Sequence, residues 1–282
     1  MSNYNFSPDF FGAGHGIRTV PAISLGVCPS RQNESVRSFD TRRNLSIPAA
    51  PEGHNTLSLE EAMRASEVLL ALAFLQQSLE HLCGSTRDRL IFGLRLGFCL
   101  LLLSGSFTGV ALVGLIGLSV VILWRFQGPY NGGSDRMGLL ILWCVALAQA
   151  MPTPVWQERV FGYLAVQLIL SYFVSGKVKL MNPEWRSGQA LADVFAFSVY
   201  PVSEGLRQWA HSPRLLWVAS WSVILFEVVF PLALINQTLL IIALCLAAMF
   251  HFANACLFGL NRFFWTWIAA YPSILWLQGR VM

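Results

Sequence analysis

Two lysines, Lys177 and Lys179, stand near the end of a long apolar run and are the only lysines in the chain. Transfer of an ammonium group from water to apolar surroundings is unfavourable, so a lysine in such a place gives up its proton more readily than a surface lysine. The neutral amine that results can accept a proton from a bound substrate. The type and position of these residues therefore indicate a candidate general base.

The helix predicted over Val160–Leu180 has one polar face. Its members recur at steps of three and four residues, the spacing of one helical stripe, and are Gln167, Ser171, Tyr172, Ser175, Gly176 and Lys179. We expect Lys179 to be the base, and Tyr172 and Ser175 to contact the substrate. Lys177 points to nearly the opposite side and is expected to contact lipid headgroups. The alternative, in which both lysines only extend to the interface at a helix end, stays open.

A carboxyl group occurs deep in another apolar run. Glu227 lies within Leu215–Ile235, where an unpaired charge costs several kcal/mol. Pro231 follows four residues later and removes the backbone donor for the Glu227 carbonyl. Glu227 is therefore a catalytic candidate that would orient or relay the proton. The competing interpretation is a structural hydrogen bond or ion pair to another helix.

His251 and Asn254 are three residues apart in the apolar run Leu239–Phe258. We expect His251 to be a catalytic proton relay and Asn254 to contact the substrate. A lone histidine also often serves packing or hydrogen bonding, so this alternative remains. The sequence contains no histidine spacing typical of a metal site, and no metal is expected.

A glycine-rich turn precedes the apolar run that begins at Met137. Asn131 is followed by two glycines, and Ser134 or Asp135 is expected to cap the next helix. Capping and turning alone would explain this segment. In the functional alternative, exposed amides at the helix start bind an anion or a polar group of a substrate. The substrate-binding candidates are then Asn131, Ser134, Asp135 and Arg136.

The composition predicts the kind of fold that positions these residues. The chain has 282 residues, of which 55% are hydrophobic and only 12% charged, which is too little charge for an ordinary soluble protein. We expect an all-α fold, a polytopic transmembrane bundle of about seven helices in a lipid bilayer. The predicted spans are Leu90–Ser104, Phe107–Trp124, Met137–Met151, Val160–Leu180, Leu215–Ile235, Leu239–Phe258 and Phe263–Leu277.

Two further regions complete the predicted organisation. Residues 1–57 are polar, without sustained periodicity, and are predicted to be a disordered tail before a helical domain over residues 58–282. Ser58-Leu-Glu-Glu is a helix-start signal for an amphipathic segment that ends at Cys83. Glu184–Tyr200 is predicted to form an amphipathic helix at the membrane interface. No motif for nucleic-acid binding is present.

Three segments resemble one family. They are SYFVSGKVKLMNPEWRSGQAL, RFQGPYNGGSDRM and HFANACLFGLNRFFWTWIAAYPSILW. They are similar to segments of the vitamin K-dependent γ-carboxylase-like membrane proteins, whose bacterial members are called HTTM domain proteins. The resemblance extends from Ser58 to the C-terminus. It implies a helical membrane fold in the inner (cytoplasmic) membrane of a bacterium.

The resemblance also implies a chemistry. In the animal carboxylases the lysine just before the leucine of the motif is held to be the base that deprotonates a reduced quinone, and SGKVKL places Lys179 there. The implied cofactor is a quinone or quinol. Two features differ from the animal enzymes. The position of a histidine that assists in those enzymes falls near Gly132–Gly133 in this chain, and the large region that holds their peptide substrate is absent. The resemblance thus supports the fold and a quinone-like pocket more than carboxylation.

Three functions are therefore open. The first is an enzyme in which Lys179 deprotonates a quinol or another lipid-soluble weak acid. The second is a non-catalytic membrane subunit that assists maturation or export of a peptide or redox protein, with the polar residues joining helices. The third is a transporter or channel, for which several helices should have polar faces. Only Val160–Leu180 shows one clearly.

Overall fold

The structure is a computed structural model that describes residues 57–83, 86–125, 132–197 and 204–281. These residues contain helices and no strands, which confirms the all-α prediction for this part of the chain. The α-helices are α1 (Leu59–His81), α2 (Thr86–Ser104), α3 (Thr108–Arg125), α4 (Gly132–Ala150), α5 (Pro154–Met181), α6 (Pro183–Ser187), α7 (Gln189–Phe197), α8 (Glu204–Arg207), α9 (Pro213–Val229), α10 (Gln237–Phe258) and α11 (Asn261–Val281). Two 3₁₀ helices are η2 (Gln208–His211) and η3 (Phe230–Ile235).

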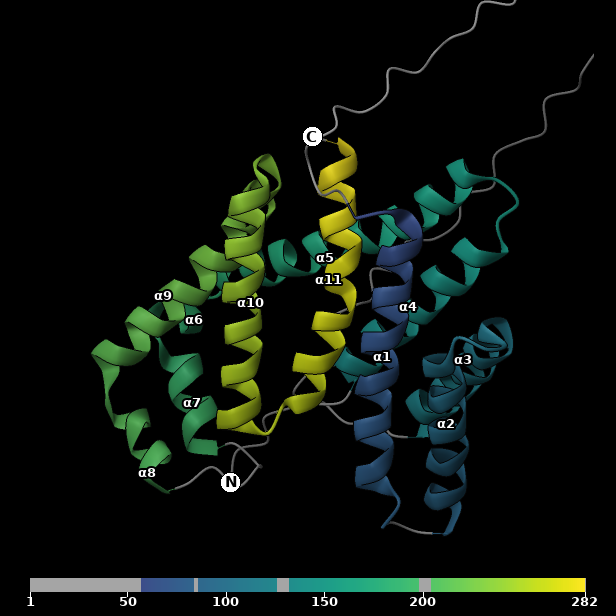
Figure 1. Cartoon of the computed structure of the whole chain (residues 1–282). Helices are drawn as coiled ribbons and strands as arrows, with labels where there is room; N and C mark the ends of the chain where they lie inside the picture. Colours follow the sequence, from purple (N-terminus) through teal and green to yellow (C-terminus); the bar gives the residue numbers. More distant parts are fainter. Residues whose placement is uncertain (1–56, 84–85, 126–131, 198–203, 282) are drawn as a thin grey trace, which may run out of the picture. The chain divides into compact units, whose positions relative to one another are not determined.

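Helix α11 has four neighbouring helices. It packs against α1, α10, α5 and α4, and Figure 1 shows α1 and α10 on either side of it, with α5 crossing behind. Helix α5 continues beyond α11 and packs against α9. The crossing brings residues from the end of α5 close to α9, α10 and α11, which are far away in the sequence.

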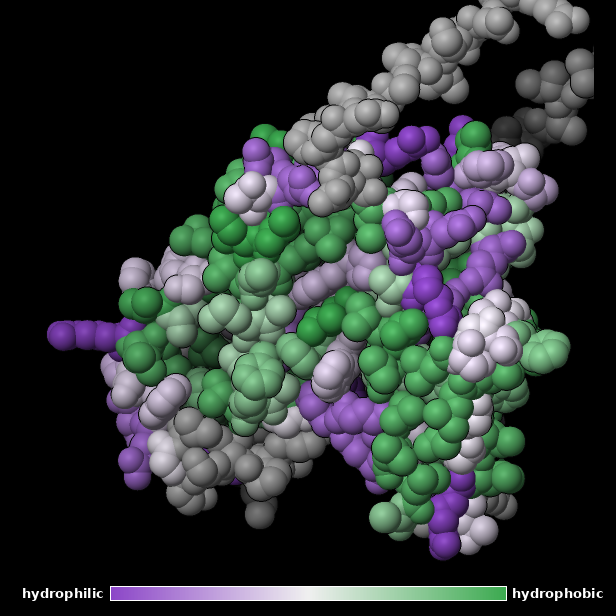
Figure 2. Space-filling model, viewed as in Figure 1, coloured by the Kyte–Doolittle hydropathy of each residue, from purple (hydrophilic) through white to green (hydrophobic). Residues whose placement is uncertain are grey.

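Four helical segments are long and apolar enough to cross a membrane: Thr108–Arg125, Pro154–Met181, Pro213–Ile235 and Gln237–Phe258. Only a minority of their side chains are buried within the protein. Figure 2 shows apolar side chains over much of the visible surface of α2 and α10, where Leu100 and Met249 are exposed. Such continuous apolar surface is expected where lipid surrounds a helix.

Three other predicted spans are helices with more polar sequences. Helices α2, α4 and α11 contain the predicted runs Leu90–Ser104, Met137–Met151 and Phe263–Leu277, but none is apolar enough to count as a span by composition. Buried polar side chains occur in each of them, such as Arg95, Asp135 and Gln278. The count of seven spans therefore stays a prediction.

The single helix predicted over Glu184–Tyr200 is divided in the structure. Gly188 has φ +83°, a conformation that glycine adopts without strain, and it separates α6 from α7. Gly188 also lies so close to α9 that an added Cβ would come within 2.9 Å of the Trp217 backbone nitrogen. The chain therefore turns here to follow α9. Residues 198–203 lie outside the described part, as does the predicted tail except for Leu57.

Prolines set the ends of α5 and α9. Asn182 precedes Pro183 and has extended backbone, which ends α5 at Met181, and its side chain accepts a hydrogen bond from the Glu184 amide. Helix α9 ends at Val229 and continues as η3 because Pro231 cannot donate to the Glu227 carbonyl. Both breaks lie within one turn of the polar residues considered below.

The predicted helix start at Ser58 is confirmed as a capping box. The Glu61 amide donates to Ser58 Oγ at 3.3 Å, and the Ser58 amide donates to Glu61 Oε2 at 3.0 Å. The hydroxyl of Ser58 also donates to Glu61, and these bonds lower the pKa of the Glu61 carboxyl below its usual 4.5.

We expect this capping box to weaken in acid. A lowered pKa contributes stability above pH 4.5 that is lost as the pH falls through the pKa of the folded state. Amide hydrogen exchange in the first turn of α1, corrected for intrinsic rates, should therefore accelerate below pH 4.5. The Ser58→Ala variant should exchange faster at neutral pH and show little of this pH dependence. An equal pH dependence in both proteins would contradict the assignment.

Arg64 joins α1 to the end of α2. Its Nη1 and Nη2 donate to the carbonyls of Leu102 and Leu103 at 2.8 and 2.7 Å, and Nη1 also pairs with buried Glu67 at 2.9 Å. These carbonyls lie in the last turn of α2, where the i+4 helical donors are missing, and the Leu102 carbonyl also accepts from the Gly105 amide at 3.2 Å.

Arg64→Ala is expected to lower the free energy of unfolding by about 1.5–3 kcal/mol, because charge-assisted bonds are lost and Glu67 keeps fewer partners. Arg64→Lys should recover only part of the loss, since one ammonium cannot reproduce the two-pronged guanidinium contact. Unfolding of the purified variants in mixed micelles would measure both. Equal stability of Arg64→Ala and the wild type would contradict this role.

Candidate functional site

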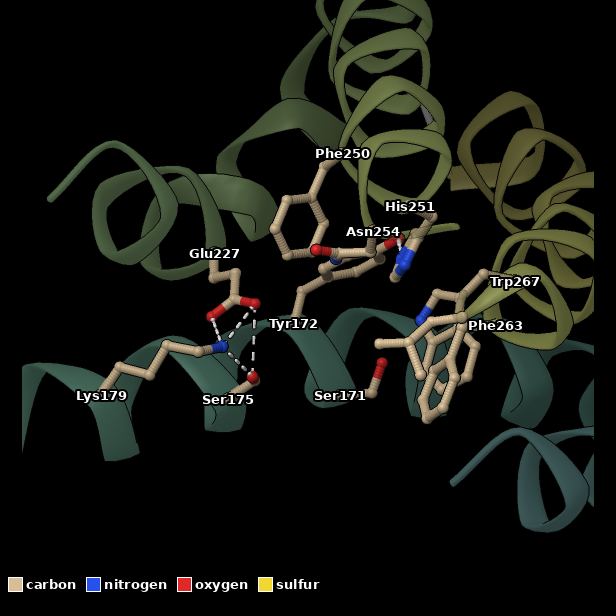
Figure 3. Close-up of a pocket in the computed structure, with 11 residues that line it drawn as sticks. Ser171, Tyr172, Ser175, Lys179, Glu227, Phe250, His251, Asn254, Phe263 and Trp267 are labelled. Carbon is tan, nitrogen blue, oxygen red and sulfur yellow. Dashed lines mark hydrogen bonds and ion pairs between the residues drawn. The ribbon is translucent and has the colours of Figure 1, made fainter. Parts of the chain in front are cut away.

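A cavity of about 210 Å³ lies where α5, α9, α10 and α11 meet (Figure 3). Six of the predicted catalytic and substrate-binding residues line it: Tyr172, Ser175, Lys179, Glu227, His251 and Asn254. Tyr172, Ser175 and Lys179 come from the polar face of α5, Glu227 from α9, and the last two from α10. The structure thus brings together residues that are far apart in the chain: Lys179 and Glu227 are 48 positions apart, and Tyr172 and His251 are 79 positions apart.

The centre of the cavity wall is an ion pair between α5 and α9. Lys179 Nζ lies 2.7 Å from Glu227 Oε1 and 2.5 Å from Oε2, and it donates to Ser175 Oγ at 2.6 Å. The Ser175 hydroxyl in turn donates to Glu227 Oε1 at 3.3 Å. Only 15% of the Lys179 side chain and 4% of the Glu227 side chain are exposed. The lysine therefore has one acceptor for each of its three protons.

Glycine at position 176 permits this pair. A Cβ at Gly176 would come 2.7 Å from the Val228 nitrogen and 2.8 Å from the Glu227 Cβ, so the two helix backbones touch here. Lys179 follows Gly176 by three residues and lies on the same side of α5. The ammonium also lies 5.2 Å from the ring centroid of Trp185 in α6.

The two lysines have different surroundings, as the helical spacing predicts. Lys177 is exposed, whereas Lys179 lines the cavity. Gln167, which belongs to the same predicted polar face, lies farther along α5 and donates to the hydroxyl of Tyr163 at 2.8 Å, outside the cavity. The part of the face that lines the cavity therefore extends from Ser171 to Lys179.

A second polar group lies beside the ion pair. The Tyr172 hydroxyl lies 3.0 Å from His251 Nε2 and 3.3 Å from the hydroxyl of Tyr271 in α11. The ring of Tyr172 packs against Phe230 of η3, with centroids 4.2 Å apart. The structure therefore surrounds a buried hydrogen-bond chain with aromatic rings.

Aromatic side chains complete the wall and were not predicted. Phe263 and Trp267 of α11 stack with centroids 5.2 Å apart and an interplanar angle of 27°, and Phe250 of α10 also lines the cavity. The signal in the sequence was the spacing of four between Phe263 and Trp267. In a chain with 10 tryptophans and 20 phenylalanines, this spacing alone does not separate a binding wall from lipid-facing residues.

The glycine-rich turn belongs to a different cluster. Helix α4 begins at Gly132, so Ser134 and Asp135 lie in its first turn, and the prediction that one of them precedes and caps the helix is wrong. The Gln77 amide of α1 donates to Asp135 at 3.3 Å, and Ser134 is buried near it in α4. Arg136 is exposed, and Asn131 lies outside the described residues. Contact of these four residues with a substrate stays a prediction.

The site combines a proton-exchanging pair with room for one ring. A carboxylate and an ammonium in direct contact can exchange a proton without moving other atoms. An engineered cavity of about 150 Å³ holds benzene, so 210 Å³ holds one ring with substituents. Among the residues that the structure describes, no three potential ligands converge to hold a metal ion.

Comparison with known proteins gives one match. Residues 143–277 match the family model of the HTTM domain. This region contains every cavity residue named above and the segments SYFVSGKVKLMNPEWRSGQAL and HFANACLFGLNRFFWTWIAAYPSILW, whereas RFQGPYNGGSDRM lies outside it. No curated protein matches the chain, and no solved structure matches it.

Proposed function

We propose that the cavity within the HTTM domain at residues 143–277 binds a lipid-soluble weak acid such as a quinol and removes a proton from it. The observation that carries this proposal is the direct contact of Lys179 with Glu227 in the wall of a ring-sized cavity. Apolar helices around the site agree with a substrate that enters from the bilayer.

The pair accepts one proton in total. In the resting state an ammonium faces a carboxylate. Transfer of one proton from Lys179 to Glu227 gives a neutral amine and a carboxylic acid, and the amine then takes the proton of the substrate hydroxyl. The products are an ammonium, a carboxylic acid and the substrate anion. The site gains one positive charge and the substrate one negative charge, so the anion is stabilised where it forms.

Neighbouring residues have supporting roles in this proposal. Ser175 holds both members of the pair, and His251 and Asn254 face the other side of the bound ring. Phe263 and Trp267 provide a flat apolar wall for it. The bilayer is the source of substrate.

The membrane arrangement is part of the same proposal. Helices α2, α4 and α11 would cross the membrane together with the four apolar segments, which gives seven spans. Helix α7 would lie at the interface, and the membrane would be the inner membrane of a bacterium. Cysteine accessibility to a membrane-impermeant thiol reagent at positions engineered into each helix connection would test the number of crossings.

Binding of menadione tests the proposal. Menadione should quench tryptophan fluorescence of the purified protein in lipid nanodiscs, because Trp267 lines the cavity. Lys179→Ala should weaken binding by about ten-fold or more, because the cavity wall loses its cation and the buried Glu227 carboxylate loses that partner. Lys177→Ala is the matched control and should bind as the wild type does. No saturable quenching in the wild type, or equal loss in both variants, would refute the proposal.

One observation favours a second function. Each proton of the Lys179 ammonium has an acceptor within the protein. Polar contacts of this kind also join two helices in membrane proteins that have no catalytic role. Such a subunit would assist maturation or export of a peptide or redox protein. A co-purifying partner and full support of that partner by a Lys179→Met variant would favour this function over the enzyme.

A further inference from the structure

Three buried polar groups form a chain beside the cavity, from α10 through α5 to α11. The Tyr172 hydroxyl stands in the middle, 3.0 Å from His251 Nε2 and 3.3 Å from the Tyr271 hydroxyl. None of the three residues is more than 8% exposed. Tyr172 and His251 line the cavity, whereas Tyr271 does not.

The protons of this chain can be arranged in two directions. In the first, Tyr271 donates to Tyr172, and Tyr172 donates to His251 Nε2. In the second, His251 Nε2–H donates to Tyr172, and Tyr172 donates to Tyr271. The second direction leaves the hydroxyl proton of Tyr271 without an acceptor among the residues that the structure describes. The first gives both hydroxyl protons an acceptor and leaves only the His251 ring N–H unpaired, and that ring lines the cavity whereas Tyr271 does not. Because a buried donor without a partner is unfavourable, the first direction is preferred.

The first direction fixes the protonation of His251. Nε2 must be an acceptor, so the proton of the neutral ring resides on Nδ1. Nδ1 has no hydrogen-bond partner in the described part of the chain, but this atom is not fully enclosed by protein. Because the ring of His251 lines the cavity, Nδ1–H is open to what the cavity contains.

We propose that Tyr172 is a positioning residue whose hydroxyl holds His251 as the Nδ1–H tautomer, so that His251 offers an N–H donor to an acceptor oxygen of the cavity's ligand. The acceptor is a carbonyl or a phenolate oxygen. The tautomer follows from the hydrogen bonds together with the position of His251 at the cavity, and only the ligand contact rests on the proposed function. Figure 3 shows His251 and the ion pair on opposite sides of Tyr172. His251 and the ion pair would therefore contact different parts of one ligand.

Nitrogen-15 NMR of histidine-labelled protein in lipid bilayers tests the tautomer without any ligand. The His251 signals, assigned with a His251→Gln variant, should show a protonated Nδ1 and an unprotonated Nε2. Tyr271→Phe should keep this pattern, because Tyr172 then has no acceptor other than His251. Tyr172→Phe should give a mixture of both tautomers. A wild-type ring with Nε2 protonated, or a Tyr271→Phe variant that switches from one tautomer to the other, would overturn the proposal.

Menadione binding then tests the ligand contact. Tyr172→Phe should weaken binding by about three- to ten-fold, the effect of one neutral hydrogen bond. Tyr163→Phe is the matched control, because Tyr163 lies on the same helix with its hydroxyl bonded to Gln167 outside the cavity. Unchanged affinity of Tyr172→Phe together with a mixed tautomer would refute the contact. Absence of binding to the wild type would refute the proposed function and leave the tautomer assignment standing on the NMR result.

Discussion

Glu227→Leu is expected to lower the free energy of unfolding by about 3–5 kcal/mol. The change leaves the ammonium of Lys179 with Ser175 Oγ as its one remaining acceptor in a mostly buried site. An uncompensated charge in such surroundings is one of the few single changes with an effect of this size. Unfolding of the purified variant in mixed micelles, followed by tryptophan fluorescence, would measure it.

The double variant Lys179→Met/Glu227→Leu provides the control. Buried ion pairs can often be replaced by apolar residues of similar volume without loss of stability. The double variant should therefore regain most of the free energy of unfolding that Glu227→Leu loses. It should not regain menadione binding if the pair acts in the chemistry. A double variant as unstable as Glu227→Leu would show that the large effect does not come from the unpaired charge.

Gly176→Ala should both destabilise the protein and disturb the site. The methyl group would meet the Val228 backbone nitrogen and the Glu227 Cβ at 2.7 and 2.8 Å, so α5 and α9 must separate. Overpacking of this kind costs about 1–3 kcal/mol, which exceeds the gain of at most about 1 kcal/mol from replacing a helical glycine. Separation of the helices also lengthens the contact between Lys179 and Glu227. We therefore expect lower stability and weaker menadione binding together.

Gly117→Ala is the matched control for this substitution. Gly117 lies in the middle of α3, and a Cβ there would meet nothing within 4 Å. The same glycine-to-alanine change should be neutral or stabilising by up to about 1 kcal/mol at this position. The opposite sign of the two effects separates close helix packing from helix propensity. Equal effects at both positions would contradict the packing argument.

The sequence predicted polar cavity-lining residues of α5, α9 and α10 because the membrane makes polar residues conspicuous. Lys179, Glu227 and His251 each stand out in an apolar run, and the cost of burying them requires partners. The polar face of α5 also followed from helical spacing. Which of these residues meet could not be predicted, since the contact depends on how α5 crosses α9.

Other parts of the site required the structure. Phe263 and Trp267 are apolar residues in an apolar chain, so nothing local distinguishes a cavity wall from a lipid-facing surface. Tyr271 gained significance only through its contact with Tyr172. The break at Gly188 was missed because the amphipathic pattern continues across it, while the reason for the turn is the backbone of α9.

The glycine-rich turn illustrates the limit of capping signals. Ser134 and Asp135 are good capping residues, yet α4 begins two residues earlier, and Asp135 contacts Gln77 of α1 instead. A buried acidic residue with a partner on another helix is a tertiary feature that local spacing does not reveal. The same holds for Arg95, which is fully buried and donates to Gln77 at 2.8 Å.

Infrared difference spectroscopy of menadiol binding tests the central claim most directly, because it observes the carboxyl group that receives the proton. Addition of menadiol to the protein in lipid bilayers should produce the C=O stretch of a protonated carboxyl group that shifts in heavy water. The band should be absent in Glu227→Gln and retained in Lys177→Ala. Binding of menadiol without this band, or a band that persists in Glu227→Gln, would contradict proton transfer to the Lys179 and Glu227 pair.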